Sequence, residues 1–125
     1  MTLLSAIPAL PVLDIGNASR YYTERLGFTL VHADDGFAVL VRDNVRIHLW
    51  AASDPNTPGA EPHLAGSASC RISVTGIEDL YAEMGNAGVL HPNGPLREQP
   101  WGERDFTVFD LDRNCISFAE RAADY

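Results

Sequence analysis

Hydrophobic and polar residues alternate along the chain in two patterns, one typical of strands and one typical of helices. Short runs rich in Ile, Leu and Val predict strands. The expected strands span residues 3–13, 28–33, 36–42, 45–51, 67–74, 89–91, 105–111 and 114–119. Pro8 and Pro11 confine the first strand to the edge of a sheet, because proline has no N–H group to donate to a neighbour.

Two other stretches carry apolar residues at helical spacing. The first helix is expected to follow a cap at residues 14–17 and to end at Gly27. Thr75 and Glu78 have the spacing of a capping box, which predicts the start of the second helix. The apolar faces are formed by Ala18, Tyr21, Tyr22 and Leu26 in the first helix and by Ile77, Leu80, Tyr81 and Met84 in the second.

The same order of elements, a strand, a helix and three strands, therefore occurs twice. The two modules span about residues 1–52 and 67–120, and a linker rich in proline and glycine covers residues 53–66. This repeat predicts a single α+β domain over residues 1–125. Each module leaves one sheet face in need of cover, and two modules can cover each other by closing around a shared cleft.

The charge balance narrows the range of partners. The chain carries 17 acidic and 9 basic side chains, a net charge of −8, which disfavours nucleic acid and anionic membranes. Its apolar runs are shorter than a membrane-spanning helix requires, and its N-terminus does not resemble a signal peptide. Cys70 and Cys115 form no metal motif, so we expect a cytoplasmic protein with reduced thiols.

One loop has the character of a binding surface. The segment Gln99-Pro100-Trp101-Gly102 places a large flat ring between two residues that favour exposed turns. A tryptophan in that setting is typical of a ligand contact rather than of a core position.

Several segments carry a resemblance to a known family. The matching segments span residues 5–8, 22–28, 35–38, 41–46, 76–83, 98–102 and 113–118. Through them the chain resembles the bleomycin-resistance proteins, a branch of the vicinal oxygen chelate superfamily that also contains glyoxalases and extradiol dioxygenases. The loop at residues 99–102 and the helix at residues 76–83 are the motifs most specific to the drug-binding branch.

The resemblance implies a fold and a function. The fold is two βαβββ modules in a homodimer whose first strand is exchanged between protomers, with Pro8 near the hinge unless it only breaks an edge strand. The function is resistance to bleomycin and phleomycin glycopeptides by stoichiometric binding, without catalysis or a cofactor. A metal would arrive only as part of the bound drug.

The resemblance also indicates where a metal-using relative would hold its ion. The four positions fall near Ile7, His48, Ser69 and Ser117. Isoleucine cannot bind a metal and neutral serine is a poor ligand, so only one imidazole is left. We therefore expect no metal of the protein's own.

Aromatic and polar side chains supply the expected ligand contacts. Trp101, with Gly102 beside it, offers a face for the flat bithiazole of the drug, and Phe37 is either the opposing ring or a core residue. Trp50 and His48 share one strand face, where they either line the crevice or only pack there.

Charged and small residues complete the expected site. Asp35 is a candidate carboxylate for the cationic tail, as are its neighbour Asp34 and Glu98 or Glu103 beside Trp101. Ser117 is expected to face the cleft. Arg71 stands where better-known relatives have a tryptophan, and it either stacks on the ligand or forms an ion pair with a carboxylate.

Two other functions remain open at this point. The chain could be a metal-dependent glyoxalase-like, dioxygenase-like or antibiotic-modifying enzyme on the same scaffold. It could also bind another flat cationic natural product, an alternative that Arg71 favours.

Overall fold

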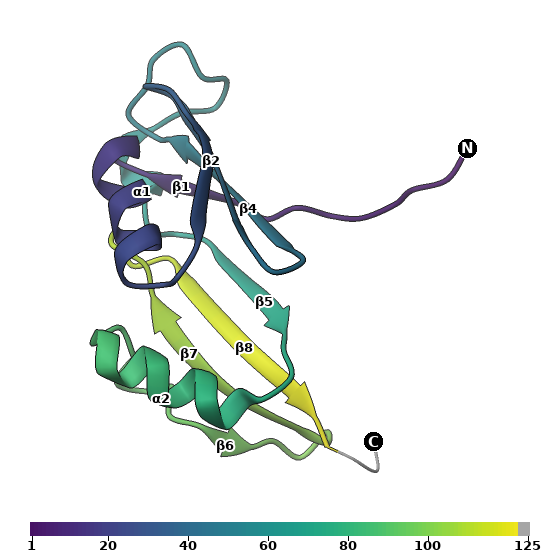
Figure 1. Ribbon diagram of the computed structural model, residues 1–125. Coiled ribbons are helices and arrows are strands. Elements are labelled where there is room, and N and C mark those ends of the chain that lie inside the picture. The colour runs from purple at the N-terminus through teal and green to yellow at the C-terminus, as the bar shows by residue number, and fades with distance from the viewer. Residues whose placement is uncertain (123–125) are drawn as a thin grey trace.

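The fold consists of two four-stranded mixed sheets, each with one helix, as the two-module interpretation predicts (Figure 1). The computed structural model describes residues 1–122. The first module contains β1 (Ala9–Val12), α1 (Ile15–Glu24), β2 (Thr29–Ala33), β3 (Phe37–Arg42) and β4 (Val45–Ala51). The second contains β5 (Ser69–Ser73), α2 (Ile77–Ala87), β6 (Arg97–Glu98), β7 (Glu103–Phe109) and β8 (Cys115–Arg121). A short 3-10 helix, η1 (Pro62–Leu64), lies in the linker.

The two sheets repeat one topology. Their strand orders are β1-β4-β3-β2 and β5-β8-β7-β6. In each module the strand that precedes the helix pairs in parallel with the last strand, and the other pairs are antiparallel. Each helix packs on one face of its own sheet. We call the opposite face of each sheet the open face.

The helix cap and the turns of the first module form where the sequence predicts them. The Asp14 side chain caps α1 by accepting a hydrogen bond from the Asn17 N–H at 3.0 Å. Gly27 follows the helix with a φ of 75°, a left-handed conformation that favours glycine. Asp43 turns the chain between β3 and β4 with a φ of 52°.

The predicted capping box of α2 is wrong. The N-cap is Gly76 and makes no side-chain hydrogen bond, while the Glu78 carboxylate binds Arg104 at 2.6 Å. The first N–H groups of the helix are instead satisfied by Glu120, which accepts from Gly76 at 2.9 Å and from Ile77 at 3.2 Å. A carboxylate from β8 thus replaces the local cap and ties the helix to the sheet.

Some predicted boundaries also need correction. The first strand is limited to β1 rather than residues 3–13, and residues 89–91 contribute only an isolated bridge from Leu90 to Val108. The short strand β6 was not predicted, since a two-residue strand is too short to show alternation.

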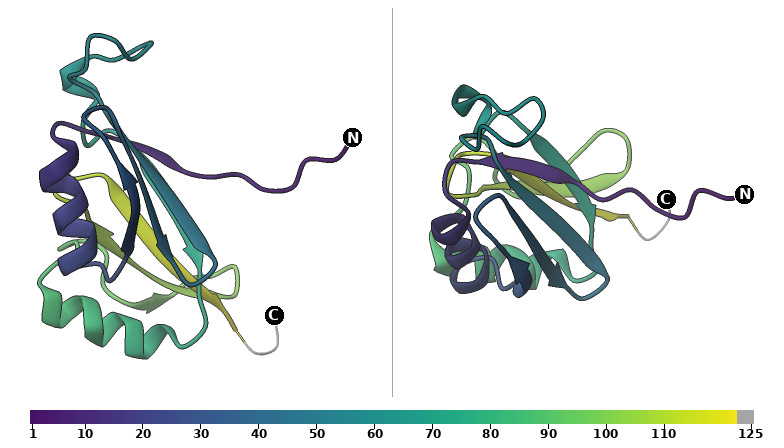
Figure 2. Two further views of the ribbon diagram at one scale, coloured as in Figure 1. Left: turned by 45° about the horizontal axis from the view of Figure 1, so that its top comes forward. Right: turned by 90° about the horizontal axis from the view of Figure 1, so that it is seen from above.

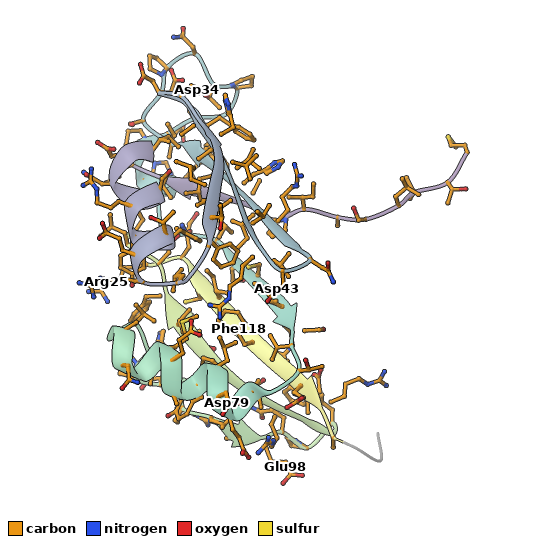
Figure 3. The ribbon with its side chains drawn as sticks, in the orientation of Figure 1. Arg25, Asp34, Asp43, Asp79, Glu98 and Phe118 are labelled. Carbon is orange, nitrogen blue, oxygen red and sulfur yellow. The ribbon has the colours of Figure 1, made fainter. Side chains whose placement is uncertain are left out.

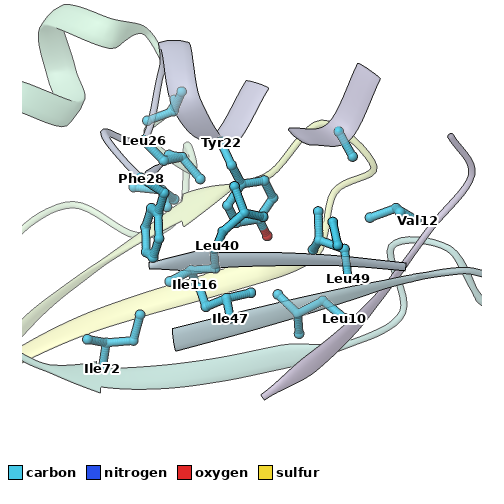
Figure 4. Close-up of a cluster of buried hydrophobic side chains, with 14 of the residues drawn as sticks. Leu10, Val12, Tyr22, Leu26, Phe28, Leu40, Ile47, Leu49, Ile72 and Ile116 are labelled. Carbon is cyan, nitrogen blue, oxygen red and sulfur yellow. The ribbon is translucent and has the colours of Figure 1, made fainter. Parts of the chain in front are cut away.

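The core lies between each helix and its sheet. Tyr22 of α1 and Leu26, two residues beyond the helix, cluster with Leu40, Ile47 and Leu49 of the first sheet, and all five are fully buried. Figure 4 shows this cluster continuing to Ile72 and Ile116 of the second sheet. The two modules therefore share one continuous hydrophobic core.

A buried polar network also joins the modules. The Asp110 carboxylate accepts hydrogen bonds from the Tyr22 hydroxyl and the Asn114 amide, both at 2.9 Å. Asn114 in turn donates to the Pro11 carbonyl at 2.8 Å and accepts from the Ala68 N–H at 3.0 Å. Burial raises the pKa of Asp110 despite these donors. The carboxylate and the amide thus satisfy backbone groups on both sides of the junction.

Residues 1–8 form an extended N-terminal arm. The arm leaves the molecule on the side opposite the helices (Figure 2). Leu3 and Leu4 are 97% and 91% exposed, an unusual state for leucine side chains. The arm therefore presents apolar surface that its own chain does not cover.

Candidate ligand-binding site

Trp101 lies at the tip of the hairpin between β6 and β7. The Gly102 N–H donates to the Gln99 carbonyl at 3.1 Å and closes the turn, and the Gln99 N–H donates to the Glu103 carbonyl at 2.7 Å. Gly102 has a φ of 92°, which suits glycine. Trp101 is 54% exposed, as its flanking residues predict. The sequence thus places an indole in solvent on a hydrogen-bonded turn.

Side chains from two strands hold this indole. The Trp101 Nε1–H donates to Glu103 Oε1 at 2.7 Å, and Arg71 Nη2 contacts the same oxygen at 3.0 Å. Arg71 also binds Asp105 Oδ2 at 2.9 Å, while the Gln99 amide donates to Asp105 Oδ1 at 2.8 Å. These contacts link both ends of the turn to β5 and β7. We call the five residues the Trp101 network.

The charges of this network stabilise one another. The hydrogen bond from Trp101, followed by that from Arg71, holds the pKa of Glu103 below its usual value. The bond to Asp105 raises the pKa of Arg71, with a further contribution from Glu103. Glu103 was predicted as a candidate carboxylate for a cationic tail, but it is already engaged by two donors.

Arg71 takes one of the two roles expected of it, the ion pair with a carboxylate, while stacking on a ligand stays a prediction. It forms the predicted ion pairs, with its side chain 43% exposed. Its guanidinium also lies over the Trp101 ring, 5.9 Å from the ring centroid. Arg71 of β5 and Trp101 of the turn before β7 therefore lie against each other at the open face of the second sheet.

A second aromatic group lies on the open face of the first sheet. Phe37 pairs with Trp50 across β3 and β4, and the Phe37 and His48 rings meet edge to face at 4.9 Å. All three are partly buried, while the alternate residues of β4 face the core. The predicted shared face of His48 and Trp50 is confirmed. His48 Nε2 is buried and has no hydrogen-bond partner within residues 1–122.

Ser117 lies on the open face of the second sheet, where its hydroxyl is 2.8 Å from that of Thr107. Cys115 shares this face by alternation along β8, while Cys70 packs against the core, so the two free thiols point to opposite faces as predicted. Burial, with the nearby Asp110 charge, raises the pKa of Cys70 to about 11. Cys70 is therefore a packing residue rather than a reactive one.

The predicted site residues separate into two groups within one chain. Phe37, His48 and Trp50 belong to the first module, whereas Arg71, Trp101, Gly102 and Ser117 belong to the second. Among the described residues, no hydrogen bond, ion pair or ring contact joins the groups.

The candidate carboxylates are also divided between the modules. Asp35 is exposed in the turn between β2 and β3, beside Asp34, whose carboxylate binds His32 at 3.0 Å. Figure 3 places Asp34 and Glu98 at opposite ends of the molecule. A single chain therefore does not gather all these carboxylates around one ligand.

The positions considered for a metal are also divided between the two modules, with Ile7 and His48 in the first and Ser69 and Ser117 in the second. Ile7 belongs to the N-terminal arm and is 44% exposed, and Ser69 is exposed on β5. Within residues 1–122, no three His, Cys, Asp or Glu side chains are grouped closely enough to hold an ion.

Gln99 and Asp105 were missed by the sequence analysis. Alternation along β7 could have placed Asp105 on the same face as Glu103. The pairing of Glu103 and Asp105 with Arg71 depends on β8 lying between β5 and β7, an order that no local pattern reveals.

Comparison with known sequences gives consistent matches. Residues 6–118 match the profile of the Glyoxalase/Bleomycin resistance protein/Dioxygenase superfamily. A bleomycin resistance protein of Geobacillus stearothermophilus is 52% identical over 129 residues, covering 95% of this chain and 98% of that protein. One from Klebsiella pneumoniae is 31% identical, covering 89% of this chain and 87% of that protein.

Comparison with solved structures also finds bleomycin-binding proteins. The bleomycin-binding protein of bleomycin-producing Streptomyces verticillus, complexed with copper(II)-bleomycin, matches with a TM-score of 0.78. It is 27% identical, and the match covers 98% of each chain. The bleomycin resistance determinant of transposon Tn5 matches with a TM-score of 0.76 at 25% identity, covering 95% of this chain and 98% of that one. Neither α1 nor α2, the two α-helices in the described part of the chain, is long and apolar enough to cross a membrane.

Proposed function

Because the chain belongs to the glyoxalase/bleomycin resistance protein/dioxygenase superfamily, we propose that it confers resistance by binding bleomycin-type glycopeptides stoichiometrically, without converting them. The observation that carries this proposal is Trp101, an indole that is half exposed yet held by the Glu103 carboxylate. An exposed aromatic ring that is already held in place binds ligands favourably, because little conformational freedom is lost when a ligand stacks on it.

Stacking is the main interaction in this proposal. The bithiazole of the drug is flat, and a ring contact contributes about 0.5–1.5 kcal/mol beyond the area that it buries. Phe37 supplies a second ring for a sandwich, with Trp50 and His48 beside it. Asp35 lies among the acidic groups that would attract the cationic tail from a distance.

A homodimer would bring the two groups of site residues together. Phe37 and Trp101 lie in different modules of one chain, so a crevice that uses both can form between the open faces of two chains. The exposed leucines of the N-terminal arm support strand exchange, because a partner's surface can cover them. Pro8 lies directly before β1, at the position where such an arm would leave its own sheet.

The proposal assigns no catalytic residue and no metal of the protein's own. Any metal would enter within the drug, and the protein would act in the cytoplasm. The free cysteines are consistent with that compartment.

Isothermal titration with metal-free and copper-loaded bleomycin tests the proposal. We expect saturable heat at micromolar protein with one ligand per protomer, and recovery of unchanged drug after denaturation of the complex. The absence of heat from both forms would reject drug binding, whereas a chemically altered drug would reject binding without turnover.

The mass of the protein in solution tests the dimer. Light scattering during gel filtration should give twice the chain mass for the full chain and a smaller apparent mass when residues 1–7 are deleted. A monomeric full chain would rule out the shared crevice.

Elemental analysis tests the absence of an intrinsic metal. Protein purified without chelator should contain far less than one Mn, Fe, Ni or Zn per chain. A stoichiometric metal would favour an enzyme of the same superfamily.

A further inference from the structure

Arg71 holds a central position in the Trp101 network. It projects from β5, yet its contacts are with residues of β7 and with Trp101 in the turn that precedes β7. Its Nη2 atom lies between Glu103 Oε1 at 3.0 Å and Asp105 Oδ2 at 2.9 Å. Both carboxylates are well shielded, with side-chain exposures of 18% and 13%. The positive charge of the guanidinium thus offsets the repulsion between the two carboxylates, which little solvent would screen.

The same arginine acts on the indole in two ways. Through Glu103 it fixes the acceptor of the Trp101 N–H, because both donors share one oxygen atom. Directly, it places a positive charge over the Trp101 ring. A ligand that stacks on the indole therefore meets a ring whose other partner is a cation.

A cation on one face changes what the opposite face prefers. An aromatic ring attracts cations because its faces have a negative potential. The positive charge of the Arg71 guanidinium offsets this potential. A second cation on the opposite face also meets the repulsion of the first. An uncharged planar ring meets no such repulsion and keeps its dispersion and stacking energy.

From this geometry we propose that Arg71 is a positioning and specificity-determining residue, which holds the Trp101 ring in place and makes it select uncharged planar heteroaromatic rings over cationic ones. This inference deepens the proposed function, on which it rests, by naming the part of a ligand that the indole accepts. Positive groups of the same ligand would then bind away from the ring.

The first test uses the free protein and needs no drug. The Trp101 indole N–H signal in a nitrogen-15 correlation spectrum is identified by its loss in Trp101→Phe. In Arg71→Met we expect this proton to exchange with water about threefold to tenfold faster, while the Trp50 signal serves as an internal reference. Arg71→Lys should restore part of the protection, because it keeps the charge but not the planar fork.

The second test measures ring selectivity with quinoline and N-methylquinolinium, which differ mainly in charge. Titrations followed at the Trp101 indole signal should show about threefold tighter binding of quinoline to the wild-type chain. Arg71→Met should remove or invert this preference. Arg20→Met, which removes the same charge from the exposed surface of α1, should leave it unchanged.

The outcomes separate this inference from the proposed function. Unchanged exchange and unchanged selectivity in Arg71→Met would overturn the role of Arg71, even if the wild-type chain binds bleomycin. Failure of the wild-type chain to bind either probe at millimolar concentration would also overturn it. If bleomycin gives no heat but quinoline is preferred, the proposed drug is wrong and the role of Arg71 stands.

Discussion

At the residue scale, exposure and order are combined in Trp101. Side chains at the tips of hairpins are usually free to change rotamer, but this indole has a hydrogen bond at 2.7 Å to a carboxylate that is itself held by an arginine. The ring is therefore available to a ligand while its N–H group keeps a hydrogen bond within the protein. Its contribution to binding can be separated from its contribution to folding, because little of the core depends on it.

Replacement of Trp101 by alanine should weaken bleomycin binding more than tenfold, because the stacking surface is lost. Trp101→Phe should have a smaller effect, since it keeps an aromatic face but not the N–H group. Isothermal titration measures both affinities, and urea unfolding checks that both variants remain as stable as the wild-type chain. Equal affinities for wild type and Trp101→Ala would contradict the stacking interaction.

The sequence correctly predicted the orientation of a side chain where that orientation depends on a single strand or turn. Period-two alternation put His48 and Trp50 on one face, and flanking Pro and Gly put Trp101 in solvent. It did not predict the partners of Arg71. Those depend on the register of three strands, in which residue 71 approaches residues 103 and 105 across β8.

At the element scale, α2 shows how a helix end can depend on a distant strand. Its N-terminus lacks a local cap, since Gly76 has no side chain, and Glu120 of β8 accepts two of its N–H groups. The sequence predicted the helix correctly from its apolar face but assigned the cap to Thr75 and Glu78. A rule based on local spacing cannot show that the N–H groups of the helix bind the Glu120 carboxylate, which is more than forty residues away in the sequence.

Replacement of Glu120 by alanine should lower the free energy of unfolding by about 0.5–2 kcal/mol, the range for loss of a helix cap. Glu120→Gln should lower it less, because an amide oxygen can still accept one of the two hydrogen bonds. Urea unfolding followed by circular dichroism measures both changes. A matched pair at Glu78, replaced in the same two ways, should change stability less, because the Glu78 side chain is 71% exposed in its ion pair with Arg104.

At the scale of the whole molecule, the two modules are joined by polar contacts as well as by the core. Arg42 of the first module forms a bidentate ion pair with Glu83 of α2, at 2.7 and 2.9 Å, and also donates to the Leu26 carbonyl. The hydrogen bond from Arg42 holds the pKa of Glu83 below its usual value. The sequence predicted both modules, but not this contact, since neither residue carries a signal of its partner.

The lowered pKa of Glu83 predicts a pH-dependent contribution to stability. The ion pair stabilises the fold above the unfolded-state pKa of about 4.3, and this contribution is lost as the pH falls through the lower folded-state value. At pH 7, Glu83→Gln should lower the free energy of unfolding by about 0.2–1 kcal/mol, because the pair is partly exposed.

Urea unfolding of wild type and Glu83→Gln at pH 7 and at pH 3.5 measures this difference. The gap between the two proteins should shrink at the lower pH. Glu61→Gln, an exposed change in the linker, should show no comparable gap at either pH. A gap that stayed constant with pH would mean that Glu83 stabilises the fold by packing rather than by charge.

The junction at Asn114 limits how such a chain can be recombined. One amide group of the second half holds the Pro11 carbonyl of the first half and the Asp110 carboxylate beside it. The linker at residues 53–66 looks like a natural crossover point for exchanging halves between related genes, but Pro11 lies on one side of it and its partner on the other. Chimaeras joined there should keep the Asn114 contact whenever the second half supplies the amide, because the Pro11 acceptor is a backbone carbonyl. The hydrogen bond from Tyr22 to Asp110, in contrast, needs one side chain from each parent, so halves that lack either partner should give less stable chimaeras.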